Sequence, residues 1–102
     1  MASSEIKKIS DENQLTGHGF EVVKIGASFC ENCVEYQPAF QTLAEKFSQA
    51  KFYQADVEDV RISPVYDVDE IPCTMIYKNG LKISEIIGFD QGTIRTIEQF
   101  LL

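Results

Sequence analysis

Residues 20–40 read FEVVKIGASFCENCVEYQPAF, and they join an apolar segment to a cysteine pair and then to a helical pattern. The segment from Phe20 to Gly26 is short and rich in β-branched residues, which is typical of a buried strand, although Lys24 interrupts it. From Cys30 to about Ala50, apolar residues recur at spacings of three and four, which predicts a long helix. Pro38 lies inside this helix and should kink it. The stretch therefore predicts a buried strand that leads into a long helix.

Outward from this stretch, strand and helix patterns alternate. Strands are expected at Ile6–Ile9, Lys51–Asp56, Cys73–Lys78 and Leu81–Ile87, the last two joined by the hairpin turn Asn79-Gly80. Helices are expected after the capping residues Ser10-Asp11-Glu12 as far as Gly17, weakly over residues 58–66, and over Thr93–Leu102. This order predicts an α/β fold with a central mixed β-sheet and helices on both faces. The residues expected to form the core are Val22, Val23, Ile25, Phe40, Leu43, Phe47, Phe52, Val57, Ile76, Ile87, Ile97 and Phe100.

Length and composition limit the classes of protein that this chain can belong to. At 102 residues and 44% hydrophobic residues, we expect residues 1–102 to form a single domain. The net charge of −7 argues against a nucleic-acid partner, which needs a basic surface. No apolar run approaches the ~18 residues of a membrane span, so we expect no membrane partner. The chain begins MASSE, without an apolar stretch behind a basic one, and we expect no secretory signal and a cytoplasmic monomer.

The chemistry of the chain is expected at its cysteines. Cys30, Cys33 and Cys73 are too few, and odd in number, for a disulfide scaffold. Cys30 and Cys33 lie where the strand passes into the helix, and the first turn of a helix favours a thiolate. Cys30, at the exposed start, would be the attacking thiol, and Cys33, one turn inward, would resolve a mixed disulfide. Zinc ligands and inert structural cysteines can have the same spacing, so the residues alone leave all three alternatives open.

The order of these motifs resembles the thioredoxin family from about Ile6 to Leu102. The family has a buried strand, an aromatic residue, CxxC, a helix with an internal proline, a strand ending in acidic residues, an Ile-Pro turn, a hairpin and a later glycine. Here these features are Val22–Ala27, Phe29, Cys30-Glu31-Asn32-Cys33, Pro38, Phe52–Glu58, Tyr66-Asp67-Val68 with Ile71-Pro72-Cys73, Lys78-Asn79-Gly80, and Gly88.

The resemblance implies a thioredoxin fold and a thiol–disulfide oxidoreductase that reduces protein disulfides through Cys30 and Cys33. It also implies a cis bond before Pro72 and a partner groove lined by Phe29, Ile71 and Gly88. The redox-active disulfide would be the only redox group, with no metal and no cofactor. Electrons would come from a thioredoxin reductase or another dithiol donor, because the chain has no glycine-rich nucleotide motif.

The chain departs from the family pattern around the cysteines. Glu31-Asn32 replaces the usual Gly-Pro, Lys24 replaces a buried aspartate, and Gln54 replaces the lysine partner of that aspartate. Phe29 and Gly26 stand where the family has tryptophans. Val34 replaces a lysine, and Cys73 replaces a threonine. We therefore expect a specialised member in which Glu31, Asn32, Lys24 and Pro72 tune the redox properties.

Two of these departures act in opposite directions. The Lys24 side chain either reaches water or a carboxylate such as Glu58, or it stays buried behind Cys33. If it is buried, it favours a Cys33 thiolate or, when neutral, accepts a proton. A carboxylate at Glu31 disfavours a thiolate and so favours the disulfide. The sequence therefore leaves the reduction potential open.

Cys73 and the acidic residues bear on partners. Cys73 is expected to be a small buried hydrophobe, with a third redox thiol or a third metal ligand as alternatives. Asp69 and Glu70 should lie beside Cys30 together with Glu31, and their charges would favour basic partners. The competing function is a thioredoxin-fold binding module with a vestigial or metal-holding CxxC.

Overall fold

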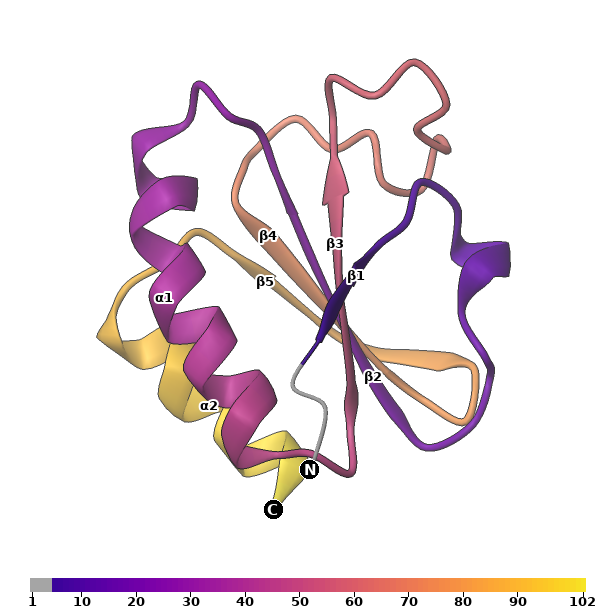
Figure 1. Ribbon diagram of the computed structural model, residues 1–102, viewed down its shortest axis with the longest axis vertical. Helices are drawn as coiled ribbons and strands as arrows, with labels where there is room; N and C mark the ends of the chain where they lie inside the picture. The colour runs from indigo at the N-terminus through magenta and orange to yellow at the C-terminus, as the bar shows by residue number, and fades with distance from the viewer. Residues whose placement is uncertain (1–4) are drawn as a thin grey trace.

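The computed structural model describes residues 5–102, which are built around one five-stranded sheet (Figure 1). The strands are β1 (Ile6–Lys8), β2 (Phe20–Gly26), β3 (Lys51–Asp56), β4 (Cys73–Lys78) and β5 (Leu81–Ile87), in the spatial order β1-β3-β2-β4-β5. The helices are α1 (Glu31–Lys46), α2 (Gln91–Leu101) and the 3₁₀ helix η1 (Glu12–Gln14). β1, β3 and β2 are parallel, whereas β4 and β5 add antiparallel pairs. The expected mixed sheet is confirmed.

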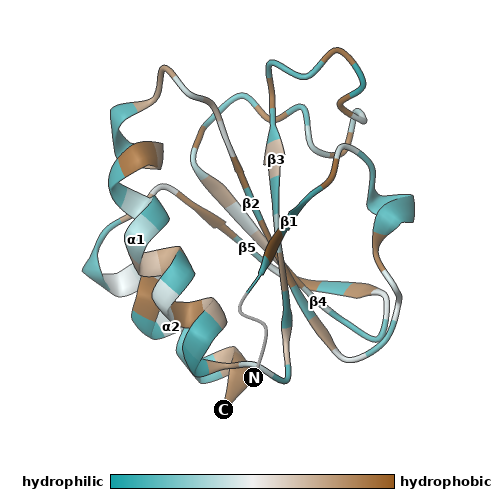
Figure 2. Cartoon of the chain, in the orientation of Figure 1, coloured by the Kyte–Doolittle hydropathy of each residue, from teal (hydrophilic) through white to brown (hydrophobic). Residues whose placement is uncertain are grey.

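Each face of the sheet carries its own apolar cluster. α1 and α2 lie side by side over one face (Figure 1), and apolar and polar residues alternate along both of them (Figure 2). Tyr36, Phe40 and Leu43 of α1 pack there against Val22 and Ile76. The other face is covered by Ile9 and Leu15, on either side of η1, and by residues of the loop 57–72. This second cluster holds Ile9, Val23, Ile25, Tyr53, Ala55, Tyr66, Cys73, Met75 and Tyr77. No helix of residues 5–102 combines the length and the apolar character needed to cross a membrane.

The expected helix over residues 58–66 is wrong, because this stretch forms successive turns. The carboxylates of Asp56 and Asp59 accept hydrogen bonds from the N–H groups two residues ahead, those of Glu58 at 2.8 Å and Arg61 at 2.9 Å. Such local bonds compete with the backbone bonds of a helix. The segment therefore remains an irregular loop.

Element ends and core membership need further corrections. Ile87 was expected in the core but is 57% exposed, because it is the last residue of the edge strand β5. Val57 and Phe100 are partly buried and pack against the two clusters. α1 ends at Lys46 rather than near Ala50, and the first short helix ends at Gln14 rather than Gly17. The expectation that the chain begins without a secretory signal concerns its first residues, of which residues 1–4 lie outside the described residues.

The turn between β4 and β5 has the expected conformation. Asn79 and Gly80 both have positive φ angles, of 51° and 84°, as a two-residue hairpin turn of type I′ requires. The Asn79 N–H donates to Gly19 O at 2.9 Å, and the Gly19 N–H donates to Asn79 Oδ1 at 2.8 Å. The hairpin is thereby joined to the loop that precedes β2.

A buried carboxylate anchors the same loop. Glu21 of β2 is fully buried and accepts hydrogen bonds from Tyr53 Oη at 2.5 Å and from the N–H groups of Thr16 and Gly17, each at 2.9 Å. Burial alone raises the pKa of Glu21, but these hydrogen bonds outweigh it and hold the pKa below its ordinary value. The charged carboxylate therefore stabilises the fold.

The first turn of α1 lies directly against the end of β2. A Cβ atom added at Gly26 would lie 2.9 Å from Cys33 Sγ and 3.2 Å from Cys33 Cβ. Real Cβ atoms essentially never come within 3.0 Å of another atom, so a side chain at residue 26 would force Cys33 Sγ or its surroundings to shift.

The first prediction concerns Glu21. Glu21→Gln removes the charged acceptor and should lower the free energy of unfolding at pH 7 by about 1–3 kcal/mol. Because the folded-state pKa of Glu21 is lowered, its contribution is present above the unfolded-state pKa and is lost as the pH falls through the folded-state pKa. Urea unfolding measured from pH 7 to about pH 3 should therefore show that the difference in the free energy of unfolding between the two proteins becomes smaller. A difference that stays constant over this range would contradict the account.

The second prediction concerns Gly26. Gly26→Ala should destabilise the reduced protein by about 1–3 kcal/mol, because the new methyl group overlaps Cys33 Sγ. In a Cys33→Ala background the sulfur is absent, and the same substitution should cost much less. Urea unfolding of the four reduced proteins forms a double-mutant cycle. Equal costs in the two backgrounds would show that the contact with sulfur does not limit residue 26.

Candidate active site

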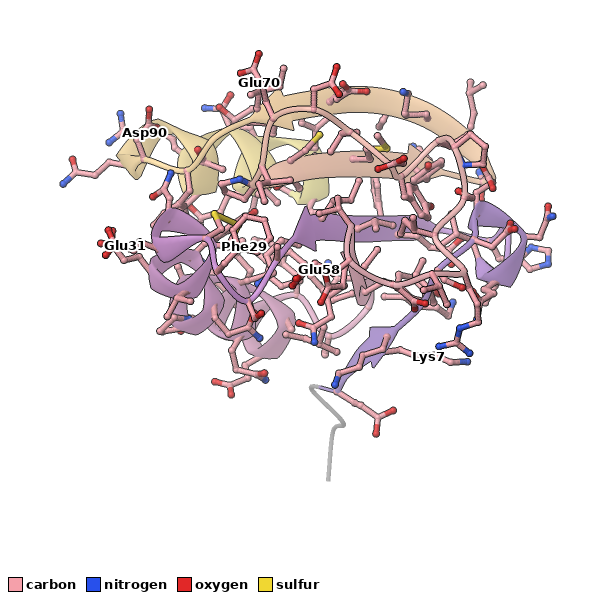
Figure 3. All side chains as sticks on the ribbon, turned by 90° about the horizontal axis from the view of Figure 1, so that it is seen from above. Lys7, Phe29, Glu31, Glu58, Glu70 and Asp90 are labelled. Carbon is pink, nitrogen blue, oxygen red and sulfur yellow. A yellow bond between two sulfur atoms is a disulfide. The ribbon has the colours of Figure 1, made fainter. Side chains whose placement is uncertain are left out.

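The candidate site lies at the carboxyl ends of β2 and β3, where three loops meet α1. Residues 27–30 connect β2 to α1, residues 57–72 connect β3 to β4, and residues 88–90 connect β5 to α2. Backbone hydrogen bonds join these loops, from Val57 N to Gly26 O at 3.0 Å and from Gly88 N to Pro72 O at 2.7 Å. Figure 3 looks onto this end of the molecule. The loops form the surface on which the cysteine pair lies.

Cys30 and Cys33 are joined in a disulfide, with their Cα atoms 5.2 Å apart. Cys30 is the N-cap residue of α1, and its Sγ accepts a hydrogen bond from the Cys33 N–H at 3.2 Å. Cys33 is only 5% exposed, whereas Cys30 is half-buried. The two sulfurs therefore differ in access, with Cys30 the outer and Cys33 the inner partner.

The residues expected to line a groove come together beside Cys30. The Ile71–Pro72 peptide bond is cis, as the resemblance implied. Ile71 O lies 4.0 Å from Cys30 Sγ, and the Gly88 hydrogen bond holds Pro72 in place from the other side. Phe29, immediately before the pair, is 70% exposed. Cys30 therefore lies beside an exposed aromatic ring and a backbone segment that a cis bond and a hydrogen bond fix.

Lys24 lies behind the pair, on the face of β2 that α1 covers. It is 6% exposed, and its Nζ donates to Gln37 Oε1 of α1 and lies 5.5 Å from the ring centroids of Tyr36 and Phe40. Burial lowers the pKa of Lys24 to about 8. The suggested pairing with Glu58 is wrong, because Glu58 accepts from Ser28 Oγ at 3.1 Å instead. The buried alternative for Lys24 is the one found.

A pocket of about 580 Å³ opens between α1, β2 and β3. Lys24 and Cys33 both line it, together with Gln37, Gln54, Asp56 and Glu58. Gln54 is the β3 residue paired with Lys24 across the sheet. The inner cysteine and the buried lysine therefore share one small, partly polar space.

Cys73 does not join the pair. It belongs to the apolar cluster on the sheet face away from α1, and its thiol is free and buried. Burial, followed by the nearby charge of Glu85, raises the pKa of Cys73 to about 11. Within residues 5–102, no three His, Cys, Asp or Glu side chains are grouped so that they could share a metal ion. The expectation of a small buried hydrophobe describes Cys73 well.

Several acidic side chains lie at the same end of the molecule as the exposed Phe29 ring. In Figure 3, Glu31, Glu58, Glu70 and Asp90 extend around Phe29 at this end of the molecule. Glu31 and Asn32 form the exposed first turn of α1. Asp69 and Glu70 are exposed on the loop that leads to Ile71, the neighbour of Cys30. We call Glu31, Asp69 and Glu70 the acidic rim.

Sequence analysis missed two parts of this arrangement, the Gln37 partner of Lys24 and the contact between Gly26 and Cys33. The sequence shows only part of what is needed to find them. Lys24 and Gly26 are two apart on a strand, and Cys33 and Gln37 are four apart on a helix, so each pair lies on one face. If one cross-contact had been known, the other could have been inferred.

Comparisons with known proteins agree with this geometry. The family model described as Thioredoxin matches residues 5–101. A thioredoxin of Aspergillus fumigatus, Asp f 29, is 33% identical over 94 residues, covering 84% of this chain and 86% of that protein. Thioredoxin-1 of Schizosaccharomyces pombe is 34% identical over 87 residues, covering 84% and 80%.

Solved structures show the same fold. The oxidised thioredoxin of Plasmodium falciparum superimposes with a TM-score of 0.82 at 16% identity, covering 96% of this chain and 100% of that one. A thioredoxin of Malassezia sympodialis gives 0.81 at 21% identity, covering 99% and 94%. These likenesses concern the fold, whereas the family model and the two closer sequences concern descent. The chain belongs to the thioredoxin family and is a thiol–disulfide oxidoreductase.

Proposed function

We propose that this protein is a specialised reductant of protein disulfides whose cysteines are flanked by basic residues. The observation that carries the proposal is the position of Cys30, a helix N-cap between the exposed Phe29 ring and the acidic rim. Disulfide-containing proteins would be its substrates, and a thioredoxin reductase or another dithiol donor would reduce it. The Cys30–Cys33 pair is its redox group, so no cofactor is needed. We place the protein in the cytoplasm as a monomer.

The two cysteines take different roles in this proposal. Cys30 attacks the partner disulfide, because it is the more accessible sulfur and receives the Cys33 N–H bond at the helix terminus. The partner then remains bound to Cys30 as a mixed disulfide. Cys33, held inside against Gly26, attacks Cys30 Sγ and releases the reduced partner.

The preference for basic partners rests on the charge around Cys30. The exposed carboxylates of the acidic rim attract a basic chain and repel an acidic one. Phe29, Ile71 and Gly88 would supply the apolar and backbone contacts of the groove. Selection by charge would therefore act on the approach of the partner and on its orientation.

The function can be tested with pairs of disulfide peptides that differ only in their flanking residues. With dithiothreitol as donor, the peptide flanked by lysine and arginine should be reduced faster than the one flanked by aspartate and glutamate. Cys30→Ser and Cys33→Ser should each abolish turnover. Equal rates on the two peptides, or insulin reduction as fast as that of an ordinary thioredoxin, would contradict the specialised function.

Alkylation should distinguish the three thiols. Limiting iodoacetamide at pH 7, added to the reduced protein, should modify Cys30 first. Cys33 is buried against Gly26 of β2, and Cys73 is both buried and protonated because its pKa is raised to about 11. Mass mapping of the labelled peptides gives the order. Labelling of Cys33 or Cys73 before Cys30 would reverse the proposed roles.

The contribution of the acidic rim should appear as a salt-dependent rate. Glu31→Gln should lower kcat/KM for the basic peptide at low salt by about twofold to fivefold, with little effect at high salt, because it removes one exposed charge near Cys30. Glu45→Gln is the matched control, since it removes an equal charge about 21 Å away along α1. If both substitutions have the same effect, net charge rather than the acidic rim governs partner choice.

A further inference from the structure

Two neighbouring contacts join β2 to α1 beneath the active site. In one, Gly26 lies against Cys33, and in the other, Lys24 Nζ donates to Gln37 Oε1. Lys24 and Gly26 are two residues apart on the strand, and Cys33 and Gln37 are four apart on the helix, and both separations are about 6 Å. Gln37, which holds the ammonium, therefore lies one helical turn from Cys33, and Lys24 and Cys33 line the same pocket.

No carboxylate neutralises Lys24 directly. Among residues 5–102 its only hydrogen-bond partner is the neutral amide of Gln37, and it forms no ion pair. The residues paired with it across the sheet, Gln54 on β3 and Thr74 on β4, are also neutral. The charged groups that line the same pocket are Lys8 of β1, Asp56 of β3, and Glu58 and Asp59 of the following turn.

The acidic groups of the pocket are engaged elsewhere. Glu58 accepts from Ser28 Oγ, Asp56 accepts from the Glu58 N–H at 2.8 Å, and Asp59 binds Arg61 at 3.2 Å. Among residues 5–102, the oxidised protein thus holds a buried cation that forms no direct ion pair. Burying this charge costs free energy, and burial accordingly lowers the pKa of Lys24 to about 8.

Reduction of the disulfide allows Cys33 to become a thiolate in the pocket that Lys24 also lines. We propose that the Lys24 ammonium is the counter-charge of the Cys33 thiolate in the reduced protein, so that Lys24 is a positioning residue for the resolving step. This rests on the role of Cys33 proposed above. In that step Cys33 Sγ attacks Cys30 Sγ, and a new S–S bond forms as the bond from Cys30 to the partner breaks. The partner sulfur leaves with the electron pair and takes a proton from solvent, while Lys24 keeps its proton.

The direct test is the titration of Cys33 as the only thiol. In a Cys30→Ser, Cys73→Ala background, the signal of isotope-labelled cysteine in NMR spectra gives the pH at which half of Cys33 is ionised. Lys24→Met should raise this midpoint by about one to three pH units, the usual effect of removing an opposite charge that lies close to a titrating group. In Lys24→Arg, which keeps the positive charge, the midpoint of Cys33 should stay closer to its value in the protein that has Lys24.

Lys8→Met is the matched control. It removes a second cation of the same pocket and changes the net charge equally, but Lys8 is exposed on β1, so the midpoint of Cys33 should move by a few tenths of a unit at most. Equal shifts for Lys8→Met and Lys24→Met would overturn the proposal. So would an unchanged midpoint in a folded Lys24→Met protein.

The unmodified protein provides a second test that needs no variant. With isotope-labelled lysine, Lys24 should titrate near pH 8 in the oxidised protein and at least about one unit higher after reduction, because coupling between the two groups is reciprocal. The same midpoint in both redox states would overturn the proposal even if Lys24→Met fails to fold. Neither titration uses a partner protein. If Cys33 and Lys24 titrate as expected but basic peptides are not preferred, only the proposed specificity is contradicted.

Discussion

The close contact between Gly26 at the end of β2 and Cys33 in the first turn of α1 is the constraint on which the site depends. It brings the helix N-terminus against the sheet, which leaves Cys30 at the rim as the N-cap and buries Cys33 beneath it. The same approach brings Gln37 over Lys24, one turn further along. Because a Cβ atom at residue 26 would lie 2.9 Å from Cys33 Sγ, the position of the inner sulfur depends on a missing side chain.

Burial and nearby charges give the two cysteines different surroundings. Cys30 shares its surface with an exposed aromatic ring, the carbonyl of Ile71 and the acidic rim, so its environment suits the encounter with a partner. Cys33 shares a small pocket with Lys24, so its environment suits the control of its own ionisation. The carboxylates of the acidic rim are exposed, whereas the ammonium of Lys24 is buried.

Much of this arrangement can be predicted from the sequence, for identifiable reasons. Apolar runs bounded by turn residues predict β2 to β5 with their observed bounds, and Asn79-Gly80 predicts the hairpin. The helix expected over residues 58–66 fails because Asp56 and Asp59 bond to the backbone locally, and Ile87 fails because strand patterns do not show which strand lies at the edge. The cis bond before Pro72 follows from family resemblance only. The partner of Lys24 depends on the register of α1 over β2, which no local pattern contains.

The kinetics of the two thiol steps offer the most direct test that Lys24 acts on Cys33. An aromatic disulfide that releases a coloured thiolate reports both steps in a single mixing experiment, because attack by Cys30 releases the first thiolate and resolution by Cys33 releases the second. The account predicts that Lys24→Met moves the pH profile of the second phase upward by about one unit or more and leaves that of the first phase unchanged. Two unchanged profiles, or an equal displacement of both, would contradict it.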